Sequence, residues 1–104
     1  MSSSLLPPPS PALTVHEAAA RIRRTAECAT AAMARNDYWS VGWQRGVTNA
    51  IGGYEGDLAA FFSPAMAAEF ADWLDTVASA NARHGHPLPP LAVAAARALD
   101  QPAA

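Results

Sequence analysis

The chain has no lysine, a single cysteine and no long apolar run, and each of these absences narrows what the protein can be. The seven basic residues are all arginine and face nine acidic residues, which gives a formal net charge of −2. Nucleic-acid phosphates are neutralised by a basic face, and this balance does not provide one, so we expect no nucleic-acid partner. No stretch approaches the roughly 18 apolar residues that a membrane span needs.

The cysteine content points to a reducing compartment. Cys28 has no second cysteine to pair with, so an internal disulfide is excluded, which fits the cytoplasm. We expect Cys28 to be a buried, inert thiol on a helix. The N-terminus has neither a basic segment nor a long apolar segment of the secretory type, so we expect no signal peptide.

Alanine is in excess, with 26 residues. It is the best helix former and lets helices approach to about 8 Å. We predict an N-terminal Pro-rich arm (1–12), a single helical domain with a β-hairpin (13–100) and a short tail (101–104). Proline excludes a helix in the arm and favours polyproline II. The arm is either solvated or docked on a neighbour.

The clearest helical pattern covers residues 64–83, which we predict to be the central helix. Ser63-Pro64 supplies an N-cap followed by proline at the first helical position, and Gly85 fits the residue after the helix end. Large apolar residues recur at steps of four, three and four, and with Leu74 they are expected to face the core: Met66, Phe70, Trp73 and Val77.

Three further helices are predicted, over residues 14–35, 57–62 and 91–99. Thr14 and Glu17 fit a capping box at the start of the first helix, and Asp57 is the expected cap of the second. The basic cluster on the first helix is expected to be solvated rather than to bind phosphate: Arg21, Arg23 and Arg24.

Residues 38–51 are predicted to form a β-hairpin. Trp39, Val41 and Trp43 alternate with small or polar residues, and Gln44-Arg45-Gly46 would form the turn. A lone hairpin is marginally stable in water, so its Trp face must lie on the helices or on a partner. The predicted fold class is therefore α+β, mainly α, with about four helices and one hairpin.

No motif for catalysis or for a cofactor is present, and we expect neither an enzyme nor a cofactor. Glu55 and Asp57 could serve as an acid–base pair, and His84 with His86 could bind zinc. A helix cap explains Asp57 and a helix stop explains the histidines. Catalysis and metal binding therefore remain minor alternatives.

The aromatic residues between positions 38 and 62 exceed what small Ala-rich helices can cover. Packing into the core is the first interpretation of these residues. The best functional candidate is an interface, because Tyr and Trp are enriched at binding hot spots, with Arg45 at the hairpin tip as its polar anchor. The predicted partner-binding residues are Tyr38, Trp39, Trp43, Arg45, Tyr54, Phe61 and Phe62.

Two segments resemble a known group of proteins. Residues 57–75 read DLAAFFSPAMAAEFADWLD and residues 91–99 read LAVAAARAL. They are similar to small uncharacterised proteins of actinobacteria and their phages, in which a short helix and an x-Pro turn lead into a helix ending Ala-Asp-Trp-Leu. The N-terminal half departs from that pattern, since Asn36-Asp37-Tyr38-Trp39 stands where a Pro-Gly-Pro-Trp-like turn is common. The resemblance implies a phage or prophage accessory gene and brings no catalytic residues.

The expected function is that of a small, cytoplasmic, non-enzymatic protein that binds another protein of host defence or regulation. An inhibitor of a CRISPR effector is one concrete form. The first alternative is a self-assembling or virion-associated component, in which the N-terminal arm clasps a neighbour in a homo-oligomer. The second alternative is a small metal-binding protein or enzyme. Exposure of Trp39 and Trp43 distinguishes a docking surface from a covered core.

Overall fold

The computed structural model describes residues 10–100, and it is 86% helical, with no strand among these residues. The elements in chain order are α1 (Pro11–Ala34), the 3-10 helix η2 (Asp37–Val41), α2 (Trp43–Ile51), α3 (Gly53–Ala60), α4 (Pro64–His84) and α5 (Pro90–Asp100). The described chain is therefore all-α, and the predicted α+β class with a hairpin at 38–51 is wrong. Within residues 10–100 no helix combines the length and apolarity needed to cross a bilayer.

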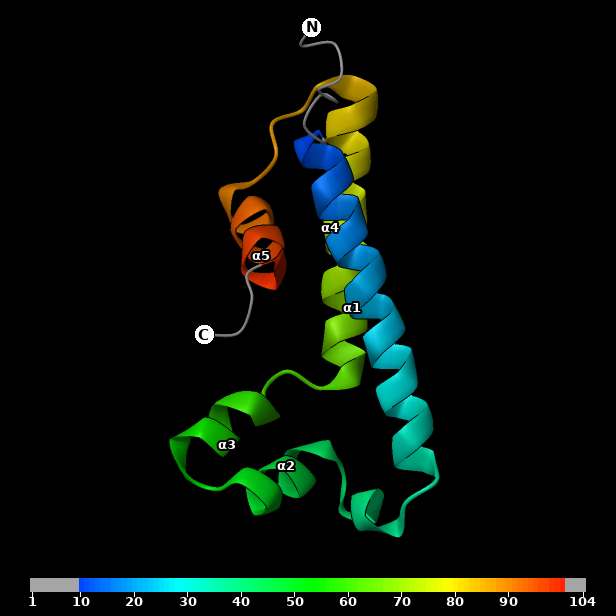
Figure 1. The fold of residues 1–104 in the computed structure, drawn as a ribbon, viewed down its shortest axis with the longest axis vertical. Coiled ribbons are helices and arrows are strands. Elements are labelled where there is room, and N and C mark those ends of the chain that lie inside the picture. Colours follow the sequence, from blue (N-terminus) through cyan, green and yellow to red (C-terminus); the bar gives the residue numbers. More distant parts are fainter. Residues whose placement is uncertain (1–9, 101–104) are drawn as a thin grey trace, which may run out of the picture.

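The body of the molecule is a long antiparallel pair, α1 and α4 (Figure 1). The short helix α5 packs beside α1 at one end of this pair. At the other end η2 turns the chain away from α1, and α2 and α3 pack on each other in a V-shaped unit that projects to one side (Figure 1). We call residues 43–60 the α2–α3 unit.

Small side chains fill the contact between α1 and α4. Ala19 and Ala71 have no exposed surface, and within residues 10–100 the largest side chains that are less than 2% exposed are Leu74 and Val15. Alanine lets the two helix axes approach closely, but it contributes little buried apolar area. The core cluster consists of Val15, Ala18, Ala19, Ala71, Leu74, Ala78, Ala92 and Ala96.

The predicted core face of α4 is confirmed only in part, because Leu74 is fully buried whereas the bulkier residues lie at the edge of the core or outside it. Met66 is 52% exposed, and Phe70, Trp73 and Val77 are only partly buried at the edge of the core. Helix α4 carries a second apolar stripe with the same period, and this stripe packs against α1 because its small residues permit the closer approach. Its members are Ala67, Ala71, Leu74 and Ala78.

Two Ser-Pro pairs begin the two long helices. Ser63 Oγ accepts a hydrogen bond from Met66 N at 3.1 Å, as predicted for the start of α4, and Gly85 follows its end with a φ of 70°. The same arrangement starts α1, where Ser10 Oγ accepts from Leu13 N at 3.1 Å. Helix α1 therefore begins at Pro11 rather than at the predicted Thr14. The rest of the Pro-rich arm (1–9) and the tail (101–104) lie outside the described residues.

One side-chain cap and two glycine breaks delimit the three short helices of residues 37–60. Asn36 Oδ1 accepts from Tyr38 N at 2.9 Å and starts η2, while Gly42 and Gly52, with φ of 92° and 77°, separate η2, α2 and α3. Left-handed φ values of this kind are accessible mainly to glycine. A short helix pairs its backbone groups along its own length except at its two ends, whereas a two-stranded hairpin leaves both edges unpaired. Asp57 lies inside α3 and is not its cap.

Two glycines allow close packing within this part of the chain. A Cβ atom on Gly46 would lie 2.6 Å from the Trp39 ring, so the indole packs directly on the α2 backbone. Tyr38 Oη donates a hydrogen bond to the Gly46 carbonyl at 2.5 Å. A Cβ atom on Gly56 would meet its nearest neighbour, Ile51 Cβ, at 3.4 Å, which is an ordinary contact.

Substituting these two glycines by alanine has opposite expected effects. Gly46→Ala forces the Trp39 ring aside, at an overpacking cost of about 1–3 kcal/mol that exceeds the gain in helix propensity of about 1 kcal/mol. Gly56→Ala keeps that gain without a clash and raises the free energy of unfolding. Urea unfolding followed by far-UV circular dichroism measures both, and equal effects would contradict the described packing.

A larger side chain in the alanine contact is expected to separate α1 from α4. Ala71→Leu adds three carbon atoms where no free surface remains and lowers the free energy of unfolding by about 1–3 kcal/mol. Ala32→Leu, at an exposed position of α1, changes it by less than about 0.5 kcal/mol. Thermal unfolding of the two variants is the measurement, and a tolerated Ala71→Leu would contradict the close contact.

Candidate functional site

Three of the predicted partner-binding residues form a cluster at the foot of α1. Trp39 and Trp43 stack with ring centroids 5.4 Å apart, and Tyr38 meets Trp39 edge-on at 5.0 Å. Both Trp residues are half-buried, and the Trp43 indole N–H has no acceptor among the described residues. The predicted Trp face is therefore not a free docking ribbon; its rings mainly hold η2 against α2.

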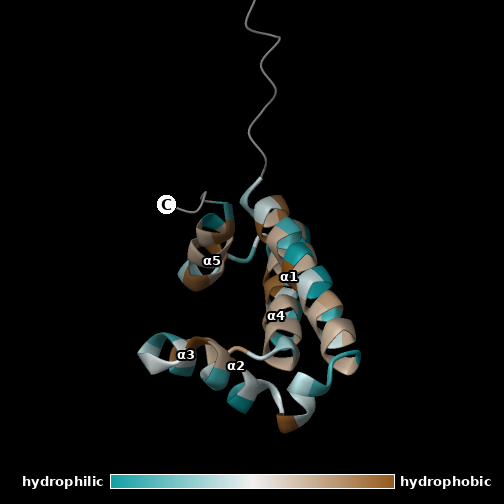
Figure 2. Ribbon diagram, turned by 60° about the horizontal axis from the view of Figure 1, so that its bottom comes forward, coloured by the Kyte–Doolittle hydropathy of each residue, from teal (hydrophilic) through white to brown (hydrophobic). Residues whose placement is uncertain are grey.

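Another set of large apolar side chains lies on the surface between the end of α2 and the start of α4. The most exposed are Tyr54 at 89%, Leu58 at 71% and Phe61 at 69%. Figure 2 shows hydrophobic stretches on the α2–α3 unit, and the last member of the set, Met66, lies in the first turn of α4. The exposed members of the set are Ile51, Tyr54, Leu58, Phe61, Phe62 and Met66.

The exposed large apolar residues of α3 share one side of the helix. Tyr54, Leu58 and Phe61 follow at steps of four and three, which places them in one row, and Phe61 keeps helical dihedral angles. Gly56 and Ala60 are buried and lie on the opposite side. We call Tyr54, Leu58 and Phe61 the α3 stripe. It points away from the surface by which α3 packs on the rest of the molecule.

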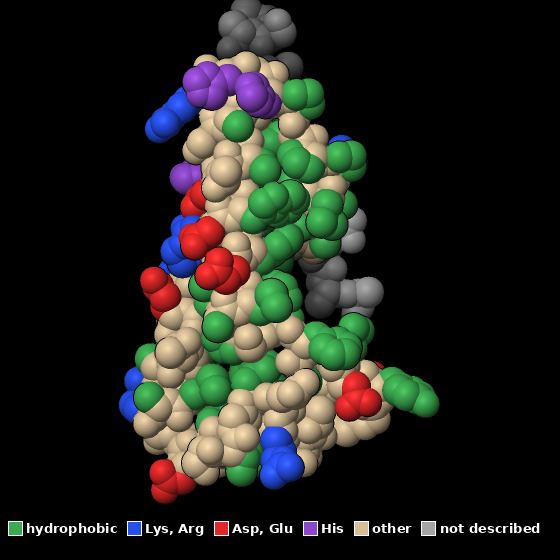
Figure 3. All heavy atoms as spheres, turned by 180° about the vertical axis from the view of Figure 1, so that it is seen from behind, with side chains coloured by type: hydrophobic (Ala, Val, Ile, Leu, Met, Phe, Trp, Pro, Cys, Tyr) green, Lys and Arg blue, Asp and Glu red, His purple; other side chains and the backbone are tan. Residues whose placement is uncertain are grey.

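Acidic side chains border the α3 stripe. Glu55 lies on one side of the row and Asp57 on the other, both are exposed, and α3 carries no basic residue. Figure 3 shows a hydrophobic side chain standing free of the body at the α3 end, beside an acidic one. The two carboxylates that we considered as an acid–base pair are therefore separated by an apolar row.

The remaining predicted residues have separate environments. Arg45 is exposed on α2, where no hairpin tip exists. Phe62 contacts Phe70 edge-on at 5.9 Å, and Phe70 stacks on Trp73 at 5.7 Å, so Phe62 begins an aromatic row along α4. The sequence reasoning missed Ile51, Leu58 and Met66. The spacing of Tyr54, Leu58 and Phe61 fits an amphipathic helix, but the predicted hairpin at 38–51 and the predicted helix at 57–62 left Tyr54 outside any helix.

A hollow of about 330 Å³ lies where α1, α2, α4 and α5 meet. Trp43 and Phe62 are in its wall together with small apolar residues of α1 and Leu99 of α5. The one charged residue in the wall is Arg21, whose guanidinium donates to the Leu99 carbonyl at 2.8 Å. This bond satisfies a free carbonyl at the end of α5.

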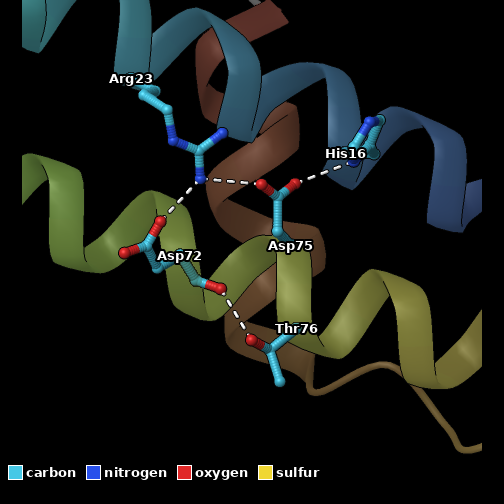
Figure 4. A network of polar contacts seen from close by, with 5 residues as sticks. All are labelled: His16, Arg23, Asp72, Asp75 and Thr76. Atoms are coloured by element: carbon cyan, nitrogen blue, oxygen red, sulfur yellow. Dashed lines mark hydrogen bonds and ion pairs between the residues drawn. The ribbon is translucent and has the colours of Figure 1, made fainter.

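The main polar cluster joins α1 to α4 (Figure 4). Arg23 Nη2 lies 2.8 Å from both Asp72 Oδ1 and Asp75 Oδ2, and His16 Nδ1 lies 2.8 Å from Asp75 Oδ1. The hydrogen bonds that Arg23 donates to the carboxylates of Asp72 and Asp75 raise the pKa of Arg23 above its ordinary value. Arg23 therefore pairs across the helices, and the prediction that it belongs to a solvated cluster is wrong.

This cluster lacks the parts of a catalytic site. An Asp–His pair can orient a general base that activates a hydroxyl nucleophile. The Thr76 hydroxyl in Figure 4 instead donates to the Asp72 backbone carbonyl at 2.9 Å. Asp75 Oδ1 has essentially no contact with solvent, and the polar group next to it is His16 Nδ1. We interpret the cluster as a polar clasp that fixes the register of α1 against α4.

The other candidate groups are dispersed. The rings of His84 and His86 are 5.7 Å apart and tilted, and both residues are exposed. Over residues 10–100 no three His, Cys, Asp or Glu side chains come together as metal ligands. Cys28 is exposed, which corrects the expectation of a buried thiol.

The clasp predicts unequal effects for its two carboxylates. Asp75 has two partners and is 27% exposed, whereas Asp72 has one and is 67% exposed. Asp75→Asn is therefore expected to lower the melting temperature clearly more than Asp72→Asn, because it removes the charge of the less exposed carboxylate, which faces both Arg23 and His16. Differential scanning calorimetry compares them, with Glu69→Gln as the exposed control. Equal melting temperatures for the two variants would contradict the clasp.

The chain matches no family model, no curated protein and no solved structure. The resemblance to actinobacterial phage proteins stays a prediction.

Proposed function

We propose that this protein acts by binding another protein through the α3 stripe and the apolar side chains next to it. The observation that carries this proposal is the exposure of large hydrophobic residues between positions 51 and 66. A chain whose core is built from alanine leaves these residues outside, where they are available to a partner.

The size of this surface fits a protein interface. A free aromatic side chain presents about 150–250 Å². At exposures of 69–89%, the three residues of the α3 stripe present on the order of 400 Å². A typical monomer has a largest apolar patch of about 300–600 Å², and a standard interface buries about 800 Å² on each partner. The α3 stripe is thus comparable to the largest apolar patch of a typical monomer and suits the centre of an interface.

The polar groups support binding rather than chemistry. His16, Arg23 and Asp75 join α1 to α4, and Arg21 holds the end of α5. Glu55 and Asp57 lie on either side of an apolar row, with no histidine on α3. These groups have structural or bordering positions, so we propose a non-enzymatic role.

One concrete form of this role is inhibition of a bacterial anti-phage defence complex, such as a CRISPR effector, in the host cytoplasm. Its support is the resemblance of residues 57–75 and 91–99 to phage-associated proteins. The α3 stripe would then cover a working surface of that complex. Co-expression in a host with an active CRISPR system should restore phage plaque formation. Absence of restoration would remove this form while leaving the binding proposal in place.

The binding proposal is tested by affinity capture from an actinobacterial lysate with variants of the full chain. The double substitution Tyr54→Ser/Leu58→Ser removes two members of the stripe and is expected to lower retention of a defined partner at least about tenfold, as for loss of interface hot spots. Leu91→Ser is the matched control, because Leu91 is an exposed leucine on α5, outside the α2–α3 unit. Far-UV circular dichroism confirms folding of each variant.

Two results would contradict the proposal. One is a monodisperse monomer that retains no protein. The other is retention that is equal for the wild type and the double variant.

A further inference from the structure

We infer that the surface receiving the α3 stripe is an apolar groove bordered by lysine or arginine, on a different protein rather than on a second copy of this chain. This inference rests on the proposed function and adds the chemistry of the partner. Its observations are the row Tyr54, Leu58 and Phe61 and the exposed carboxylates of Glu55 and Asp57 on its two sides.

The helix geometry fixes what a partner meets. The buried side of α3, at Gly56 and Ala60, packs against α2, where Gly56 approaches Ile51 and Thr48. The opposite side is therefore presented outward, as in peptides that lay an amphipathic helix in a groove. A partner that covers the row brings the rims of its groove close to both carboxylates.

Charge complementarity determines which residues are favourable at the rim of the partner's groove. Carboxylates at the border of an apolar contact are attracted by basic side chains and disfavour acidic ones, which sets partner choice and association rate. Helix α3 has two acidic residues and no basic residue to offset them. A groove with a basic rim fits this pattern, and a groove with an acidic rim opposes it.

The same charges disfavour a second copy. If two α3 stripes packed face to face about a twofold axis, an antiparallel pair would place Glu55 beside Glu55 and Asp57 beside Asp57. A parallel pair would place Glu55 beside Asp57. Either arrangement brings like charges together, whereas closed dimers rely on self-complementary surfaces. Docking the stripe elsewhere on a second copy is a head-to-tail contact, which closes only for particular rotations.

Two synthetic helical peptides test the inference on the full chain. Both are about 18 residues long and carry the same leucine row, at i, i+3, i+4 and i+7. One has lysine and the other glutamate on both sides of the row. Fluorescence anisotropy of the labelled peptides is expected to show about tenfold tighter binding of the lysine peptide, with a preference that weakens at high salt.

Variants separate this contact from general attraction between opposite charges. Glu55→Gln/Asp57→Asn is expected to abolish the preference and leave binding through the row. Leu58→Asp adds negative charge, so it would strengthen unspecific attraction of the lysine peptide; we expect it instead to lose binding. Leu91→Asp adds the same charge on α5 and should bind as the wild type does.

Three outcomes would overturn the inference: equal binding of both peptides, binding of neither, or concentration-dependent dimers that Leu58→Asp abolishes. The last outcome, measured by sedimentation velocity, would assign the stripe to a second copy. These outcomes differ from failure of the proposed function. Stripe-dependent capture of a lysate protein together with equal peptide binding would reject the basic rim alone.

Discussion

The close contact of α1 with α4 through alanine is the constraint on which the rest of the structure depends. Alanine at the contact brings the helices together, and among the described residues Leu74 and Val15 are the largest side chains that are fully buried. A helix that packs its small residues inward must carry its bulky residues elsewhere, as α4 does with Met66 and Phe70. Stability therefore comes from close approach, helix propensity and the clasp of Arg23, rather than from a broad hydrophobic interior. The exposed apolar surface is a consequence of this way of building the core.

The α2–α3 unit places exposed apolar residues on a part of the molecule that projects from the α1–α4 pair. η2 contacts both α1 and α2, and the stacked rings of Trp39 and Trp43 hold this corner, with Gly46 providing room for the indole. α2 and α3 then pack chiefly on each other, and α3 rejoins the body through Phe62 and the start of α4. Trp39 and Trp43, which the sequence suggested as an exposed face, thus hold the corner of the chain in place. The residues exposed to a partner are those of the α3 stripe, which follows them in the chain.

The sequence predicted what depends on neighbouring residues. Ser63 and Gly85 marked the ends of α4 because a cap and a left-handed glycine act locally. The same Ser-Pro signal at Ser10 was missed because prolines around it suggested an extended arm. The spacing of Trp39, Val41 and Trp43 fits a strand as well as two short helices, and only the glycine breaks and the Asn36 cap decide between them. Which stripe of α4 faces α1 could not be predicted, since both have the helical period. Tyr54, Phe61 and Phe62 were predicted as surface residues, whereas Leu58 required knowing that α3 starts at Gly53.

The carboxylates that border the α3 stripe affect both self-association of the chain and the proposed contact with a partner. A row such as Tyr54, Leu58 and Phe61 on a chain of net charge −2 has little overall repulsion to keep copies apart. Glu55 and Asp57 supply that repulsion locally, because any symmetric pairing of the row brings carboxylates together. A basic rim reverses the sign of the same interaction. In the proposed contact, one pair of side chains therefore both disfavours self-association and favours the partner, so that specificity arises as a difference between two affinities rather than from the strength of either.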